Sequence, residues 1–174
     1  AGSSDKNIYL FDMYNSTLLW SYTTGDSVWG VDITADGEYI AASSNYGKVY
    51  YFNKNNSTPI WSSEIEDVHL VSISANGEYI VAGTRDGNIY LFDKDRSTPL
   101  WSYTAYSGMG SVAISADGDY IAAGSSDSRV YFFGKNSSTP LWTYKAEDRV
   151  KTVAISADGK YIVAGTRDGN IYLF

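Results

Sequence analysis

The segment that decides the fold is VAISADGKYIVAGTRDGNIYLF, residues 153–174. Close copies of it begin at Val31, Val71 and Val112, so the chain is a tandem repeat. Ending each unit at its terminal Phe gives repeats of 41, 40, 41 and 41 residues: 12–52, 53–92, 93–133 and 134–174. A period near 40 residues is typical of arrays in which each unit buries its faces against its neighbours.

Residues 1–11, AGSSDKNIYLF, are a surplus copy of the end of the repeat. They match residues 164–174 at eight of eleven positions. The chain thus begins inside one repeat and stops at the last apolar residue of another, so we expect a mature piece or an excised fragment. The length favours a single domain spanning 1–174.

Each unit has the pattern of four short strands separated by turns, without a run of helical spacing. In the unit 93–133 we expect strands at 98–103, 111–115, 120–124 and 130–133. Pro59, Pro99 and Pro140 each stand two residues before a Trp. Because proline cannot donate to a β-ladder, the Trp strand is predicted to lie at a sheet edge.

The strand that ends each unit is apolar on both faces, as in Asn88–Phe92, which predicts a sheet covered on both sides. Its partner, residues 79–83, carries small Ala and Gly side chains that suit close approach of sheets. Four-stranded antiparallel sheets packed between copies of themselves are the blades of a β-propeller. We therefore predict an all-β propeller; a linear β-solenoid is the alternative.

Residues 114–127, followed by Val130–Phe133, resemble the WD-repeat blade, and residues 91–101 resemble the quinoprotein-like (PQQ-like) blade. The resemblance covers the whole chain. The Gly-His pair of WD repeats is absent and Phe replaces their Trp, so the hydrogen-bonded WD tetrad cannot form. One turn position of the repeat holds an aspartate that we expect to shape the turn: Asp5, Asp86, Asp127 and Asp168. In the remaining unit Tyr46 stands at this position.

WD-type strand order, if it applies, makes the Val-x-Ile-Ser strand innermost and the Trp strand outermost. The chain then supplies two strands, three complete blades and a three-stranded blade. Completion of the last blade by the Trp20 strand would give a ring of four blades and would leave Ile8–Phe11 without a place. Such blades resemble those of rings with about six to eight blades, so a fragment of a larger propeller and a ring or polymer of several chains both stay open.

The formal charge of −7 disfavours nucleic acid and anionic membranes as partners. The apolar runs are too short for a membrane span, and the chain has no cysteine, so it has neither a disulfide nor a thiolate site. We expect protein partners, including further copies of the chain through open blade edges, with no nucleic acid and no membrane insertion.

His69 is the only histidine, which excludes metal sites that need two imidazoles. Nucleophile-elbow and phosphate-loop motifs are absent. Calcium on turn carboxylates stays open, although no dense Asp-x-Asp-x-Asp loop occurs. We expect no catalytic, cofactor-binding or metal-binding residues, and so no enzyme.

Positions that differ between otherwise matching repeats are not needed by the scaffold. Two residues before each inner-strand Val, the repeats carry Trp29, His69, Gly110 and Lys151. In a propeller these positions gather at one end of the axis, where ligands commonly bind. We predict a recognition surface formed by Trp29, His69 and Lys151. The alternative is that these are loop residues that vary without a functional role.

Three N-glycosylation acceptors lie in the turns before the Trp strands, at Asn15, Asn56 and Asn136. They favour a secreted or cell-surface protein, with turn formation and a soluble cytoplasmic protein as the alternatives. The expected function is a non-catalytic propeller scaffold for protein binding or self-assembly. A quinoprotein-like cofactor-binding or enzymatic domain, and an engineered or amplified repeat without a specific ligand, are the alternatives.

Overall fold

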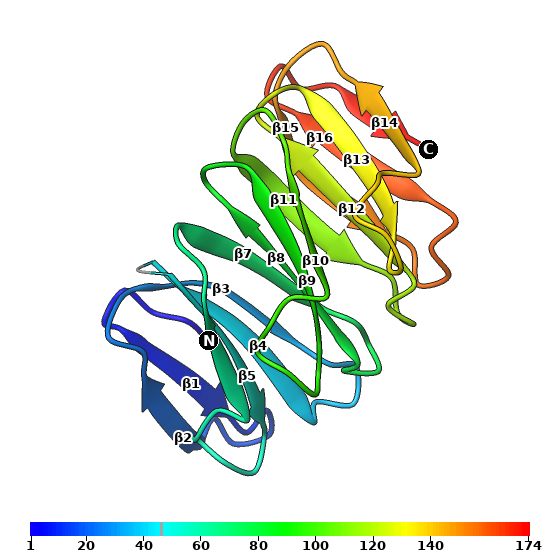
Figure 1. Ribbon diagram of the computed structural model, residues 1–174. Helices are drawn as coiled ribbons and strands as arrows, with labels where there is room; N and C mark the ends of the chain where they lie inside the picture. The colour runs from blue at the N-terminus through cyan, green and yellow to red at the C-terminus, as the bar shows by residue number, and fades with distance from the viewer. Residues whose placement is uncertain (46) are drawn as a thin grey trace.

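The computed structural model describes residues 1–45 and 47–174, whose regular structure is entirely β. Figure 1 shows the strands in succession from the N-terminus to the C-terminus. Their bounds are β1 Asn7–Phe11, β2 Leu18–Thr23, β3 Val28–Ile33, β4 Tyr39–Ser44, β5 Lys48–Asn53, β6 Trp61–Glu64, β7 Val68–Ile73, β8 Tyr79–Thr84, β9 Asn88–Asp93, β10 Trp101–Thr104, β11 Met109–Ile114, β12 Tyr120–Ser125, β13 Arg129–Gly134, β14 Trp142–Lys145, β15 Val150–Ile155, β16 Ile162–Thr166 and β17 Ile171–Leu173.

The strands form antiparallel sheets that are propeller blades, which confirms the predicted fold class. Three blades are complete, with the orders β3-β4-β5-β6, β7-β8-β9-β10 and β11-β12-β13-β14. A two-stranded sheet, β1-β2, precedes them and a three-stranded sheet, β15-β16-β17, follows. In each complete blade the Val-x-Ile-Ser strand is at one edge and the Trp strand at the other, as the sequence pattern predicts.

The tight hairpin between the first two strands of a blade depends on a glycine and an Asx side chain. Gly77 has a φ of 72°, a conformation that glycine adopts without a steric penalty. The Asn76 side-chain oxygen accepts hydrogen bonds from the Ser74 hydroxyl at 2.7 Å and from the Glu78 amide at 3.0 Å. The same arrangement recurs with Asp at the Asn76 position in the other units.

Adjacent blades pack face to face through the apolar residues that the sequence predicts to be covered. Val81, Ile89 and Leu91 of one blade share a buried cluster with Met109 and Val112 of the next. Small residues allow this approach: a Cβ on Gly124 would lie 2.5 Å from a methyl group of Val150 in the following blade. Burial of such apolar surface is the main stabilising contribution to the array.

A tryptophan of the outer strand joins each blade to the following one. The Trp61 indole N–H donates to the Lys94 carbonyl oxygen at 2.9 Å, across the blade boundary. The Trp61 ring also packs against Tyr51 of its own blade and Phe92 of the next, with centroids 5.4 and 5.5 Å away. Trp20 and Trp101 make equivalent hydrogen bonds to the carbonyl oxygens of Lys54 and Lys135.

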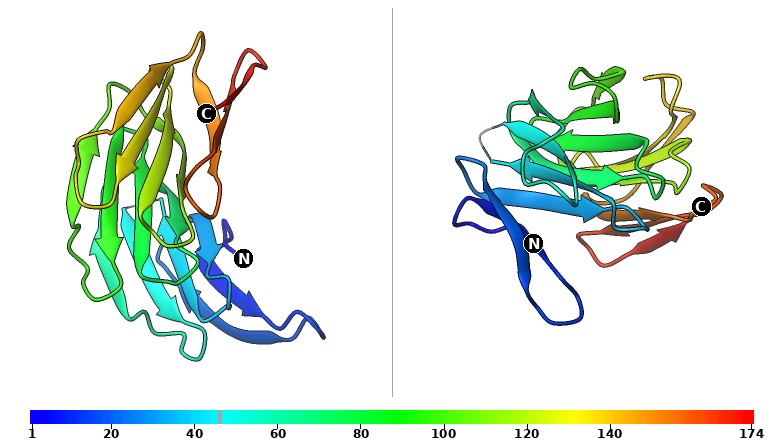
Figure 2. Two further views of the ribbon diagram at one scale, coloured as in Figure 1. Left: turned by 90° about the vertical axis from the view of Figure 1, so that its right-hand side faces the viewer. Right: turned by 90° about the horizontal axis from the view of Figure 1, so that it is seen from below.

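The described strands do not form a closed ring, because the Trp20 strand does not complete the last blade. Strand β2 pairs with β1, and neither strand pairs with β17. Figure 2 shows an open, curved array whose first and last sheets remain apart. The surplus segment therefore has a place, because Ile8 and Leu10 pack on the first complete blade beside Val28 and Ile40.

Candidate functional site

The predicted recognition residues occupy one structural position, a β-bulge in each inner strand. Val28 pairs with Ser44 and Gly30 pairs with Ser43, so Trp29 is an extra residue without a partner across the ladder. The register of β7, β11 and β15 shifts at the same point, at His69, Gly110 and Lys151. A β-bulge interrupts the alternation of side chains between the two faces of a sheet and so points a side chain in a new direction. Bulges are frequent next to active sites.

Trp29 presents a large apolar surface that a neighbouring blade supports. Its side chain is 57% exposed, and the guanidinium carbon of Arg85 lies 4.7 Å from its ring centroid. Arg85 also donates to the Asn45 side-chain oxygen at 2.7 Å, while its amide donates to the Asp67 carbonyl oxygen at 3.1 Å. These bonds hold the guanidinium over the indole, which is the favourable geometry for a cation–π contact.

His69 is half-buried behind this pair and is held in one tautomer. Its Nε2 lies 3.1 Å from the carbonyl oxygen of Met109, which can only accept, so Nε2 carries the proton. Burial lowers the pKa of His69, and the positive charge of Arg85 lowers it further. Nδ1 is buried without a hydrogen-bond partner among the described residues. The imidazole is therefore neutral at pH 7.

Gly110 and Lys151 do not extend this group. A Cβ on Gly110 would lie 2.3 Å from the Val150 carbonyl oxygen, so backbone packing excludes a side chain there. Lys151 is exposed, and no hydrogen bond or ion pair joins it to Trp29 or His69 within the described ranges. The structure thus brings together Trp29 and His69 through Arg85, and leaves Lys151 apart from them.

Sequence comparison of the repeats missed Arg85 and Asn45. Both occupy the turn after the second strand of a blade, where the remaining units carry Ser126 and Arg167. This position varies between repeats as much as the bulge position does, so the same comparison carried a signal for it. We refer to Trp29, Arg85, His69 and Asn45 as the bulge cluster.

A second arginine–aromatic pair lies at the same end of the blades. Tyr106, in the loop that enters β11, is almost fully exposed, and the Arg129 guanidinium lies 5.4 Å from its ring centroid. The Tyr106 amide donates to the Asp127 carboxylate at 3.3 Å, which ties this loop to the turn after β12. This end of the array therefore carries exposed aromatic rings that neighbouring guanidinium groups support.

The three sequon asparagines are exposed in the turns that precede the Trp strands. Side-chain oxygens of Asn15 and Asn56 accept the amides of Thr17 and Thr58 at 3.0 and 2.8 Å, which is the turn-forming role. Asn136 is in the equivalent turn. Both the turn role and an accessible acceptor are compatible with this placement, so glycosylation stays a prediction.

The aspartates predicted to shape turns do so. Asp5, Asp127 and Asp168 bond within their own turns, for example Asp127 to the Arg129 amide at 2.9 Å, and Asp86 accepts from Asn88 at 2.8 Å. Tyr46, the exception at this position, lies outside the described residues. In the part of the chain that the structure describes, no group of three or more His, Cys, Asp or Glu side chains could hold a metal ion.

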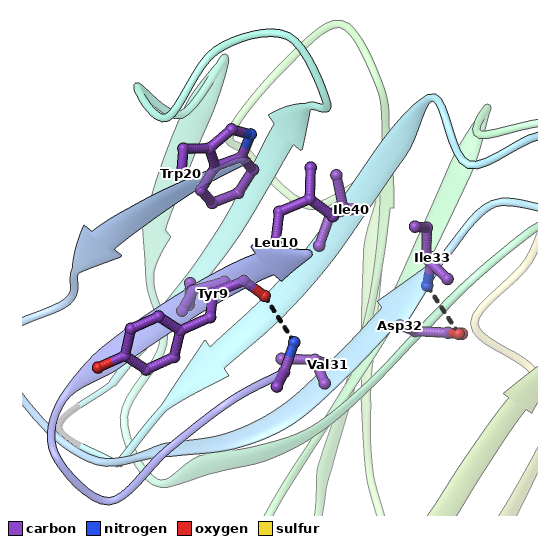
Figure 3. A pocket seen from close by; sticks show the side chains of 9 residues that line it. Tyr9, Leu10, Trp20, Val31, Asp32, Ile33 and Ile40 are labelled. Carbon is purple, nitrogen blue, oxygen red and sulfur yellow. Dashed lines mark hydrogen bonds between the residues drawn. The ribbon is translucent and has the colours of Figure 1, made fainter. Parts of the chain in front are cut away.

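A pocket of about 190 Å³ lies where the two-stranded sheet meets the first complete blade. Figure 3 shows Leu10 of β1 and Ile40 of β4 side by side in it, together with Trp20 and Ile33. Its lining is mostly apolar, and Asp32 at its rim is engaged by the Ile73 amide at 2.9 Å. The pocket therefore lacks the convergent polar groups that orient a small polar ligand.

The family model described as "Outer membrane protein assembly factor BamB" matches residues 4–174. A search of curated proteins finds no match to the chain. Among residues 1–45 and 47–174, no helix is long and apolar enough to cross a membrane.

Proposed function

The chain belongs to the outer membrane protein assembly factor BamB family of PQQ-like propellers, and from this premise we propose that it is a non-catalytic scaffold that binds a polypeptide through its bulge cluster. The family supports a protein-binding propeller as the general role. The site, the absence of catalysis and a location at the cell surface are our additions to it.

One observation carries the choice of site: an exposed indole, Trp29, lies beneath the guanidinium of Arg85. Trp and Arg are the residue types most enriched among the few that dominate binding energy in protein interfaces. Asn45 and the backbone of Asp67 hold Arg85 in place, so little side-chain freedom is lost when a partner binds. Neutral His69 adds a half-buried ring without an unpaired charge.

The family description suggests the probe: a urea-unfolded outer membrane β-barrel protein diluted into buffer, with its binding followed by fluorescence anisotropy. We expect Trp29→Ala and Arg85→Ala each to weaken binding by about tenfold or more, since loss of a hot-spot side chain costs about 2 kcal/mol. Tyr14→Ala is the matched control, because Tyr14 is an aromatic residue that is even more exposed than Trp29, at 88%, but lies in the turn at the opposite end of the blades.

Two results would remove the proposal. The first is the absence of wild-type binding to this probe. The second is binding by Trp29→Ala and Arg85→Ala that equals binding by the wild type and by Tyr14→Ala. The proposed surface location has its own test: intact-mass analysis of protein from its native source should show glycan on Asn15, Asn56 or Asn136, and an unmodified mass would contradict it.

A further inference from the structure

Two exposed aromatic rings at one end of the blades each lie beneath a guanidinium group. The Arg85 guanidinium carbon is 4.7 Å from the ring centroid of Trp29, and that of Arg129 is 5.4 Å from the ring centroid of Tyr106. Both arginines belong to complete blades that have a described sheet on each side, so neighbouring blades define their surroundings. We refer to Trp29, Arg85, Tyr106 and Arg129 as the arginine–aromatic row.

Backbone contacts make the two arginine–aromatic pairs neighbours. The loop that carries Tyr106 lies against the turn that carries Arg85. Gly108 approaches the Arg85 carbonyl oxygen so closely that a Cβ on it would have no space. In the same contact the Ala105 amide donates to the Gly87 carbonyl oxygen at 2.9 Å. The row is therefore one continuous surface that crosses three successive blades.

The two arginines of the row differ in their partners from the cations at the opposite end of the blades. Among the described residues, neither Arg85 nor Arg129 forms an ion pair, and the side-chain hydrogen bond of Arg85 goes to the neutral Asn45 amide oxygen at 2.7 Å. Cations at the opposite end are paired with carboxylates: Lys54 with Glu38, Lys94 with Glu78, Arg96 with Asp93, Lys135 with Asp119 and Lys160 with Asp158.

The aspartates adjacent to the two arginines are engaged by their own turns. Asp86 accepts a hydrogen bond from the Asn88 side chain at 2.8 Å. Asp127 accepts hydrogen bonds from the Tyr131 hydroxyl at 2.5 Å and from the Arg129 amide at 2.9 Å. These two carboxylates therefore shape turns and do not neutralise the guanidinium groups.

A guanidinium that lies over an aromatic ring can still bind a carboxylate. The contact with the ring uses the face of the planar group, whereas its N–H donors point outward in the plane. A carboxylate binds such in-plane donors through two parallel hydrogen bonds. The exposed parts of the Trp29 and Tyr106 rings offer apolar contact beside each of these positions.

We propose that the arginine–aromatic row binds one extended polypeptide segment in which acidic and apolar side chains are interspersed. Carboxylates of the segment bind Arg85 and Arg129, and its apolar side chains pack against Trp29 and Tyr106. This inference rests on the proposed function and specifies the chemistry and the extent of the bound segment.

The dimensions and the charge of the chain suit this occupant. Packed sheets are about 10 Å apart, so a row that crosses three blades spans about 20 Å, which is about six residues of extended chain. Carboxylates interspersed with apolar side chains match guanidinium groups interspersed with rings. The net charge of −7 disfavours a nucleic acid, whose phosphates would meet the negative field of the whole chain.

The test uses two fluorescein-labelled synthetic peptides of about 12 residues, which span about 40 Å when extended. One peptide carries Glu and Phe separated by Ser and Gly, and the other has Gln in place of every Glu. We expect fluorescence anisotropy to show that the wild-type chain binds the Glu peptide about tenfold more tightly than the Gln peptide. The difference should shrink at about 1 M salt, where charges are screened beyond about 3 Å.

Substitutions in the row assign the effect to its residues. Arg85→Ala and Arg129→Ala should each reduce the preference for the Glu peptide about threefold, and the double variant should bind both peptides alike. Tyr106→Ala should weaken binding of both peptides about threefold or more, because it removes a ring and no charge. Arg96→Ala is the matched control, since Arg96 is paired with Asp93 at the opposite end of the blades. Thermal unfolding of each variant, followed by circular dichroism, separates loss of the surface from loss of the fold.

The possible results have distinct meanings. Equal binding of the two peptides by the wild-type chain would overturn recognition of carboxylates. Wild-type affinity in both Tyr106→Ala and Arg129→Ala would overturn the extension of the surface beyond the bulge cluster. An oligonucleotide that displaces the Glu peptide at a lower concentration than the unlabelled Glu peptide does would overturn a polypeptide as the occupant.

Failure of this inference can be told apart from failure of the proposed function. If the unfolded outer membrane protein binds through Trp29 while neither peptide binds, the inference is overturned and the proposed function is not. If neither the unfolded protein nor the peptides bind, both are overturned.

Discussion

Replacing Trp61 tests whether the tryptophans of the outer strands hold the blades together. Trp61→Phe removes the indole hydrogen bond to the Lys94 carbonyl but keeps a ring between Tyr51 and Phe92. The lost bond costs about 1 kcal/mol. The smaller apolar area adds a loss on the order of 1 kcal/mol. We therefore expect the free energy of unfolding to fall by about 2 kcal/mol, and Tm by roughly 4–8 °C.

Trp61→Ala provides the comparison, because it removes the bond and both ring contacts and should cost about 3–5 kcal/mol. Urea unfolding followed by circular dichroism measures both variants without relying on tryptophan fluorescence, and equal m-values show that the same surface unfolds. If Trp61→Phe costs as much as Trp61→Ala, ring packing across the blade boundary contributes nothing, and the reasoning is refuted. A cost near zero for both variants would refute the role of Trp61 altogether.

Three further predictions concern single positions. Gly110→Ala should destabilise the chain by about 1–3 kcal/mol in urea unfolding, because its Cβ would collide with the Val150 carbonyl at 2.3 Å, whereas Gly134→Ala, with its nearest neighbour at 3.8 Å, should change little. Because the pKa of His69 is lowered, the folded state binds a proton there less readily than the unfolded chain does. The free energy of unfolding should therefore be at its full value above about pH 6.5 and fall as the pH drops through that value. His69→Gln should remove this part of the pH dependence, as measured by urea unfolding at several pH values. The hydrogen bond from the Ser115 hydroxyl lowers the pKa of Asp117, so the Asp117 carboxylate stabilises the fold above its ordinary pKa of 3.8 and this stabilisation is lost as the pH falls. Asp117→Asn should unfold within about 0.5 kcal/mol of wild type at pH 7, because Asn76 makes the same hydrogen bonds in its own hairpin. The variant should lack the loss of stability in acid.

Local sequence signals were sufficient to predict the structure of a single blade. The period of the repeat, the prolines before the Trp strands and the glycine of each hairpin predict strand number, edge strand and turns, and the sheet order confirms them. Strand ends differed slightly: residues 98–103 were expected to pair, and the strand is Trp101–Thr104, because Pro99 delays the ladder.

Ring closure could not be decided from the sequence because it depends on the curvature of the array. Curvature follows from how closely inner strands approach one another, through contacts such as the one that excludes a Cβ at Gly110. Such contacts join residues about 40 positions apart and leave no local pattern in the sequence. The pairing of β2 with β1 in place of the last blade is the result.

The candidate site was recognisable only in part. Variation between repeats indicated Trp29 and His69, but a bulge is a one-residue shift in pairing and carries no turn signal of its own. Arg85 was missed because it belongs to a different turn of the repeat and reaches Trp29 only through packing between adjacent blades.

The account rests most on the claim that Trp29, supported by Arg85, is the centre of a polypeptide-binding surface. Fluorescence anisotropy of the urea-unfolded outer membrane protein, titrated with the wild-type chain, Trp29→Ala and Tyr14→Ala, tests this most directly. We predict that Trp29→Ala weakens binding by about tenfold or more and that Tyr14→Ala leaves binding unchanged. Equal binding by all three proteins would contradict the claim.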